Sequence, residues 1–272
     1  IVAATLVVLG CAAADAQEPP KPDAKSEADE PSLSVAVSPE YTRGKFGTGH
    51  TTQILYIPLK TEWAATDTLE FSLTVPYLWE RGRNLRALVV GRPLTTQATG
   101  RPSRQDGRVK TEEGLGDVLL EVDYTLLEDT GFLPDVTAFV EIKFPTADSS
   151  RGLGTGAFDE AIGTYLTKKL AERWTAHLDL SYVFVGSPHG LSLDNIFTWS
   201  AGVSYGVTSA LKLSGYIDGA TTLTRDDSPP VALRAVVEYT LSRHLLLTGS
   251  ATAGLTHQAP DFGVLTEIKV RF

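Results

Sequence analysis

The last eleven residues of the chain, Phe262 to Phe272, alternate strictly between two kinds of side chain. One set of alternate positions is apolar apart from a single threonine, and the positions between them carry three charges, Glu267, Lys269 and Arg271. Successive side chains of a β-strand point to opposite faces, so this strand has one apolar face and one charged face. Such a strand suits a half-buried soluble sheet. It also suits an outer-membrane barrel, in which the apolar face meets lipid and the charged face lines a wet interior.

Eleven further segments show the same alternation, and no segment predicts an amphipathic helix. The expected strands are Leu33–Arg43, Thr52–Glu62, Thr68–Trp79, Asp117–Leu127, Asp135–Pro145, Phe158–Leu170, Trp174–Val185, Asn195–Val207, Ala210–Ala220, Val231–Leu241, His244–Gly254 and Phe262–Phe272. Strands of this length exceed the ~5–6 residues usual in soluble sheets. They suit the ~9–11 residues that a tilted strand needs to cross lipid.

The connections between these segments alternate between short and long. Ala171–Arg173 and Thr208–Ser209 are examples of short turns, whereas Thr146–Ala157 and Thr221–Pro230 are longer, and Glu80–Glu113 is predicted to be mainly loop. Short turns at one end and long loops at the other are typical of bacterial outer-membrane barrels. The sequence therefore predicts an all-β fold, a transmembrane antiparallel up-and-down β-barrel of about 12 strands.

Aromatic side chains lie near the ends of the predicted strands. They include Tyr77, Trp79, Tyr124, Phe144, Phe158, Trp174, Phe184, Phe197, Tyr239 and Phe272. Aromatic girdles at the two membrane interfaces would place them there.

The first sixteen residues predict a secretory signal peptide. Ile1 to Leu9 form an apolar core, and Ala14-Asp15-Ala16 provides an Ala-x-Ala cleavage site. An alternative is a lipoprotein site, with acylation of Cys11. Residues 17–31 are acidic, proline-rich and free of large apolar side chains, which predicts a disordered periplasmic linker before a barrel over residues 32–272. Met is absent, including at position 1, so we expect the natural chain to begin earlier.

The composition excludes several classes of function. The net charge is −9, so the chain has no basic surplus with which to bind a nucleic acid. Cys11 is the single cysteine, so an internal disulfide is impossible. No run reaches the ~18 apolar residues of a spanning helix. Barrel strands need no such run, because only half of their residues face lipid.

If the apolar face of each strand meets lipid, the other face lines the interior. By alternation, the pore-lining candidates are Glu40, Lys60, Glu70, Glu121, Asp123, Glu141, Lys143, His177, Asp179, Lys212, Asp218, Arg234, Glu238, Glu267, Lys269 and Arg271. Both signs of charge occur on neighbouring strands, so ion pairs such as Arg234 with Glu267 can form. Two interpretations follow: a charged path for a solute, or a barrel whose interior is filled by its own ion-paired side chains.

No pair of residues predicts catalysis. His177 and Ser181 share one face of a strand but lie about 13 Å apart at the usual strand rise. His189 and Ser192 lie in a loop, so neither pair forms a Ser–His nucleophile within hydrogen-bond reach. The five histidines are scattered without metal-ligand spacing. We therefore expect no enzymatic activity, no metal and no cofactor.

Four segments in the middle of the chain carry a family resemblance. They are Gly114-Leu-Gly-Asp117, Lys143-Phe-Pro-Thr-Ala-Asp148, Leu153-Gly-Thr-Gly156 and Thr175–Phe184. Over residues 114–185 the chain resembles the outer-membrane proteins named for the meta-cleavage pathway of phenol degradation, which are described as transporters. The resemblance implies a β-barrel and uptake of aromatic or other small hydrophobic compounds, and it assigns no binding residue.

Together these observations predict a barrel of the Gram-negative outer membrane that passes a small solute through a narrow, charge-lined lumen. Its expected partners are outer-membrane lipid and the solute. An alternative is a closed structural barrel whose loop Glu80–Glu113 contacts a partner or lipopolysaccharide. That loop contains seven arginines, which suit anionic groups. A soluble secreted β-sandwich is a third interpretation.

Overall fold

The computed structural model describes residues 33–47, 49–83, 85–89, 92–95, 109–187, 193–223 and 228–272. The predicted signal peptide, the linker and Cys11 lie outside these residues. The regular elements in the described part are β1 (Leu33–Val37), β2 (Glu40–Gly44), β3 (Thr52–Ala64), β4 (Leu69–Arg83), β5 (Leu85–Val89), β6 (Arg92–Thr95), β7 (Val109–Leu115), β8 (Val118–Leu127), β9 (Asp135–Phe144), β10 (Asp159–Ala171), β11 (Trp174–Phe184), β12 (Ile196–Gly206), β13 (Leu211–Ala220), β14 (Val231–Ser242), β15 (Leu245–Gly254) and β16 (Phe262–Arg271). No helix in this part is long and apolar enough to cross a membrane.

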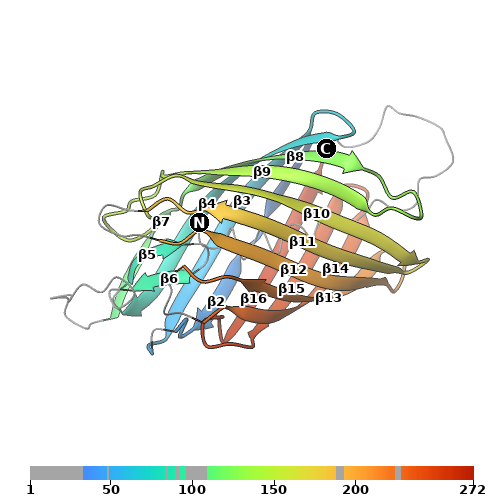
Figure 1. Ribbon diagram of the computed structural model, residues 1–272. Coiled ribbons are helices and arrows are strands. Elements are labelled where there is room, and N and C mark those ends of the chain that lie inside the picture. Colours follow the sequence, from blue (N-terminus) through green and yellow to red (C-terminus); the bar gives the residue numbers. More distant parts are fainter. Residues whose placement is uncertain are drawn as a thin grey trace.

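Fourteen of these strands form one antiparallel sheet that closes on itself (Figure 1). β1 and β2 share one position between β16 and β3, and β7 and β8 follow one another along β4. The described part is therefore a barrel of 12 strand positions, with β5 and β6 paired separately. The predicted antiparallel barrel is confirmed. Because β16 pairs with β1 and β2, no sheet edge is left open in lipid.

Burial alternates along the strands as the sequence does. In β16, Glu267 and Lys269 are buried, whereas Val264 and Ile268 are exposed. Exposed apolar side chains recur around the barrel: Val37, Leu59, Leu73, Val140, Ile162, Leu178, Val203, Leu213, Leu233, Val264 and Ile268. A continuous apolar outer surface over a polar inner face matches the requirement of a barrel in lipid.

Aromatic side chains lie at both ends of this apolar belt. At the end with the short turns, Trp63 stacks on Phe71 with ring centroids 5.7 Å apart. At the end with the long loops, Tyr182 meets Phe184 edge-on at 4.9 Å. Aromatic rings concentrate at membrane interfaces because one edge is apolar and the other tolerates water. The aromatic side chains at the two ends of the apolar belt thus mark the two membrane interfaces.

Short and long connections alternate in the structure, as predicted. Two residues join β10 to β11, whereas residues 145–158 join β9 to β10. The described ends of the chain meet at the short-turn side, where the Phe272 N–H donates to the Leu33 carbonyl at 2.8 Å. In bacterial barrels short turns face the periplasm, so the long loops face outward.

Segment 80–113 differs from the expectation. The sequence predicts mainly loop there, but β4 continues to Arg83 and pairs with β7, and β5 pairs with β6. Figure 1 shows β5, β6 and β7 together at one end of the barrel. Glu80 pairs with Glu112 in this hairpin, and Trp79 pairs with Glu113. A hairpin that extends beyond the lipid has no continuous apolar face, so it lacks the alternation on which strand prediction depends.

Candidate functional site

The inner face of the barrel carries the charged residues that the sequence placed there. Nine of them are buried: Glu40, Glu121, Lys143, Asp179, Asp218, Arg234, Glu238, Glu267 and Lys269. Seven are half-buried: Lys60, Glu70, Asp123, Glu141, His177, Lys212 and Arg271. Since none of these residues is fully exposed, the inner side chains cover one another, and any path along the barrel axis is narrow.

Arg234 on β14 organises one group of charges on this face. Its Nε and Nη2 donate to the two carboxylate oxygens of Asp218 on β13, at 2.8 and 2.9 Å. Its guanidinium carbon lies 4.3 Å from the centroid of the Tyr216 ring. The expected pairing of Arg234 with Glu267 is wrong, because Glu267 accepts a hydrogen bond from Ser38 instead. A bidentate Arg–carboxylate pair beneath a cation–π contact fixes the guanidinium in one place.

A second charged group lies across the seam where the barrel closes. Lys269 on β16 forms an ion pair with Glu62 on β3, reaching over β1. Lys60 contacts the same carboxylate at 3.0 Å, and the Ser34 hydroxyl donates to it. Charge-assisted contacts of this kind are stronger than neutral hydrogen bonds, so they join the first and last strands.

His177 contacts a different serine from the one that the sequence suggested. Its Nε2 lies 2.9 Å from Ser204 Oγ, whereas Ser181 bonds to Thr198 at 2.6 Å. A Ser–His nucleophile also needs a group that orients the second ring nitrogen. None of the described residues bonds to that nitrogen. The other candidates, His189 and Ser192, lie outside the described residues.

Toward the long-loop end the inner face becomes apolar. One cluster there consists of Leu119, Phe139, Ala161, Val183, Val185, Leu193, Ile196 and Leu223. The other consists of Phe46, Ile54, Tyr56, Leu78, Ala147 and Leu153. We call these two clusters together the apolar mouth. Each combines inward strand positions with loop residues, so the loops fold over the barrel. The sequence signal was the nearly unbroken apolar run from Ile54 to Leu59, which lacks the polar inner face of the other strands.

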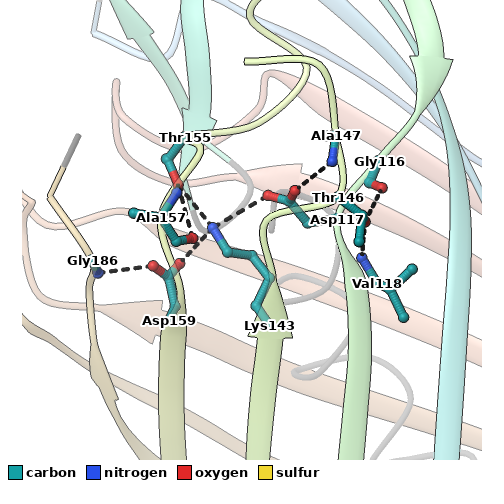
Figure 2. A network of polar contacts seen from close by, with 10 residues as sticks. All are labelled: Gly116, Asp117, Val118, Lys143, Thr146, Ala147, Thr155, Ala157, Asp159 and Gly186. Atoms are coloured by element: carbon teal, nitrogen blue, oxygen red, sulfur yellow. Dashed lines mark hydrogen bonds and ion pairs between the residues drawn. The ribbon is translucent and has the colours of Figure 1, made fainter. Parts of the chain in front are cut away.

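A buried ion-pair network fastens the loop 145–158 to the strand ends (Figure 2). Lys143 Nζ lies 3.2 Å from Asp117 Oδ2 and 3.2 Å from Asp159 Oδ2, and it donates to Thr155 Oγ1 at 2.9 Å. The charged side chains of Lys143, Asp117 and Asp159 are 1, 0 and 2 % exposed. We call these four residues the Lys143 latch.

Backbone donors complete the latch. Asp117 Oδ1 accepts from the Ala147 N–H at 2.9 Å, and Asp159 Oδ1 accepts from the Gly186 N–H at 2.8 Å. Two carboxylates therefore share one ammonium and two amide donors, which reduces the penalty for burying them. A Cβ on Gly154 would lie 2.7 Å from Asp117 Oδ2, so the loop can pass this close only with glycine at that position.

The loop 145–158 is also ordered by its own contacts. Asp148 accepts from the Ser150 hydroxyl at 2.6 Å and from the Ser150 N–H at 3.0 Å, and these bonds lower the pKa of the Asp148 carboxyl. The turn delivers Leu153, which is 2 % exposed, to the cluster that contains Tyr56 and Leu78. Those two residues belong to β3 and β4, on the other side of β8. The loop therefore lies across the mouth of the barrel.

Three of the four segments that carry the family resemblance meet at this latch. Gly114–Asp117 supplies Asp117, Lys143–Asp148 supplies Lys143 and Ala147, and Leu153–Gly156 supplies Leu153, Gly154 and Thr155. The sequence predicted Lys143 as a lining residue but did not single out Asp117, Asp159 or Thr155. The segments of the family resemblance contain Asp117 and Thr155 and were the available signal for these two residues, whereas Asp159 lies outside those segments.

A family model described as "Putative MetA-pathway of phenol degradation" matches residues 45–272. The chain belongs to this family. No curated protein sequence matches it. The match covers the latch, both apolar clusters and every strand from β3 onward, so the family assignment concerns the barrel wall apart from β1 and β2.

Solved structures show the same fold. An outer-membrane channel from Pseudomonas putida F1 has a TM-score of 0.65 at 14 % identity, covering 93 % of this chain and 100 % of that chain. The translocator domain of the autotransporter NalP from Neisseria meningitidis has a TM-score of 0.58 at 9 % identity, covering 90 % of each chain. The CymD monoaromatic hydrocarbon channel has a TM-score of 0.50 at 9 % identity, covering 90 % of this chain and 89 % of that one. The chain thus has the fold of outer-membrane β-barrels, and its apolar outer surface suits lipid.

Proposed function

We propose that this barrel is a channel that admits small apolar solutes, including aromatic ones, through the apolar mouth into the charge-lined lumen. The observation that carries the proposal is the apolar mouth itself. A channel for water and hydrophilic solutes has a polar interior. Here the inward positions near the long loops carry Ile54, Leu78, Leu119 and Val183, which favour a dehydrated apolar solute.

The family and the fold support this proposal. The family is named for phenol degradation, and one structural relative is called a monoaromatic hydrocarbon channel. We infer that the charged and histidine candidates named above line the barrel interior, with Lys143 at the level of the mouth, where Leu119 is its cross-strand neighbour. We assign the barrel no catalytic role, because its structural relatives are channels and a translocator domain.

The alternative is a closed barrel that binds a partner or lipopolysaccharide through its arginine-rich segment. Three of the seven arginines, Arg101, Arg104 and Arg108, lie outside the described residues. Arg81 is exposed at the end of β4. A surface arginine is ordinarily a solvated residue, so no contact in the described part favours this function over transport.

Uptake by intact cells tests the proposal. A porin-depleted Gram-negative strain would express the chain, and folded barrel in its outer membrane would be verified by heat-modifiable electrophoretic migration. Initial uptake of radiolabelled toluene should exceed that of cells with an empty vector, and uptake of a neutral disaccharide should not. Leu153→Asp places a charge in the apolar mouth and should reduce toluene uptake. Equal toluene uptake with and without folded barrel would refute the function.

A further inference from the structure

Two stacked aromatic rings lie on the inner wall, at the lumen end of the apolar mouth. Phe139 on β9 and Tyr165 on β10 have ring centroids 4.6 Å apart and planes 14° apart. Phe139 belongs to the apolar mouth, and Tyr165 packs against it. We propose that this pair is a binding subsite on which the ring of a neutral planar aromatic solute stacks, an assignment that rests on the transport function proposed above.

The local sequence holds the Phe139 ring flat against the wall. Gly163 lies opposite Phe139 in the register of β9 and β10. A Cβ on Gly163 would lie 2.4 Å from Cε1 and 2.5 Å from Cζ of Phe139, so the ring occupies the space of the missing side chain. The ring therefore lies over the backbone of β10 and leaves the barrel interior to Tyr165.

Tyr165 is the ring of the pair that meets the interior. Phe139 is 3 % exposed, whereas Tyr165 is half-buried. Its orientation is limited on one side by the stacked Phe139 and at its tip by Glu121, to which the Tyr165 hydroxyl donates at 3.4 Å. A ring held in place in advance loses little conformational freedom when a second ring stacks on it. Tyr165 thus offers an ordered aromatic face.

The pair stands where the apolar mouth gives way to the charged lumen. Along β9 and β10 the next inward pair on its mouth side is the apolar Ala161 with Glu141. Asp179 is the cross-strand neighbour of Tyr165 on β11, and Asp123 is that of Phe139 on β8. The inward carboxylates Glu121 and Glu141 lie on the mouth side of the pair, so a solute that leaves the mouth meets the Tyr165 ring among carboxylates of the wall.

The side chains around the pair select against anionic aromatics. The adjacent inward positions hold Glu121, Asp123, Thr137, Glu141, Asp179 and Ser181. None of these six is a lysine or an arginine, so a solute carboxylate would meet no cationic partner there. The subsite should accept toluene and phenol and disfavour benzoate.

Ring stacking should be visible as a selectivity. Two stacked aromatic rings gain binding free energy beyond that of the apolar area they bury. This gain corresponds to about a two- to tenfold preference for an aromatic solute over a saturated one. In the uptake assay, wild-type barrel should take up toluene about two- to tenfold faster than methylcyclohexane, after subtraction of uptake without the barrel. Tyr165→Leu should abolish this ratio, and Tyr165→Phe, which keeps the ring, should retain it. Tyr182→Leu, on the outer face of β11, is the matched control and should also retain it.

The outcomes separate the subsite from the channel. If neither hydrocarbon enters faster with folded barrel, the proposed function fails. If both enter faster but at equal rates in wild type, or if Tyr165→Leu keeps the ratio, the channel stands and the subsite is overturned. Phe139→Leu removes the supporting ring from another strand and should also lower the ratio, so the test does not depend on folding of one variant. Benzoate uptake equal to that of toluene would overturn the charge selectivity.

Discussion

Replacement of Lys143 by methionine should release the loop 145–158 from the barrel. The substitution preserves an unbranched side chain of similar length and removes only the ammonium. Asp117 and Asp159 would then face each other at 0 and 2 % exposure without the cation that lies 3.2 Å from each. The loop would respond first, because the strand ladders below it do not depend on Lys143.

The size of the expected increase in loop opening follows from the burial of the ion pairs of Lys143. Removing one partner of a buried ion pair costs about 3–5 kcal/mol, because it leaves an uncompensated charge. At about 1.4 kcal/mol per tenfold, this increases the population of the open loop by a factor on the order of 10² to 10⁴. The increase is an upper bound, since water that enters the opened latch solvates the carboxylates.

Limited proteolysis reports the open population. Arg151 lies in the loop, where its neighbours Gly152 and Leu153 donate backbone hydrogen bonds to Ser149 and Asp148. Trypsin should cleave after Arg151 much faster in Lys143→Met than in wild type, since cleavage follows the population of the open form when opening is rapid. The fragment that ends at Arg151 identifies this cleavage by mass.

Two controls make the test specific. Lys168 also forms an ion pair, with Asp129 at 2.8 Å, but at a half-buried position at the other end of the barrel. Lys168→Met should leave Arg151 cleavage within about fivefold of wild type, because this ion pair makes no contact with the loop 145–158. Adding Asp117→Asn and Asp159→Asn to Lys143→Met should restore protection in part, because the amide oxygens still accept the backbone N–H groups. Cleavage in Lys143→Met within about fivefold of wild type would refute the latch.

Three further predictions concern the latch, the seam and an exposed turn. Gly154→Ala places a Cβ 2.7 Å from a latch carboxylate oxygen, so Arg-specific cleavage of the loop should rise as in the lysine variant, and unchanged protection would contradict the close approach. Lys269→Met should lower the free energy of unfolding in detergent by about 1–3 kcal/mol, measured by urea titration, because Glu62 loses a charge-assisted contact across the seam; a loss under about 0.5 kcal/mol would argue against a role in closure. The hydrogen bond from Lys168 lowers the pKa of Asp129 to about 2. The contact between Lys168 and ionised Asp129 therefore stabilises the fold above about pH 4, and this stabilisation is lost as the pH falls toward about 2. In Asp129→Asn, the unfolding temperature should depend less on pH within that window. An identical pH profile for the variant would show that the contact does not stabilise the fold.

Much of the barrel wall could be predicted from the sequence, because the alternation within each strand has a local cause. Lipid on one side and charged neighbours on the other impose a period of two on every strand, and residues such as Glu267 and Ile268 show their side without reference to any partner. The boundaries of most strands, to within a few residues, and the inward positions of the charged residues followed from this pattern, although the expected strand Leu33–Arg43 is two strands, β1 and β2. It failed in β7 and in the extension of β4, where no lipid imposes it.

Pairing on the inner face depends on strand register, which is not local. Glu267 is aligned with Thr248 and through it with Glu238 on β14, four residues along that strand from Arg234. Asp218 is a diagonal neighbour of Arg234 instead, and diagonal neighbours are within reach of a long side chain. Alternation specifies the face that a residue occupies but contains no information about this offset.

The closing strand shows what the sequence alone determined and what it could not. Its alternation established a barrel wall with lipid on one side and charges on the other, because the face of a strand residue depends only on its own position in the pleat. The tertiary structure decided that Lys269 pairs with Glu62 two strands away, that Lys143 fastens a loop, and that apolar residues close the mouth. Those contacts join residues far apart in the chain, and they depend on the relative register of the strands and on the course of the loops. A periodicity of two in the sequence specifies neither the register nor the course of the loops.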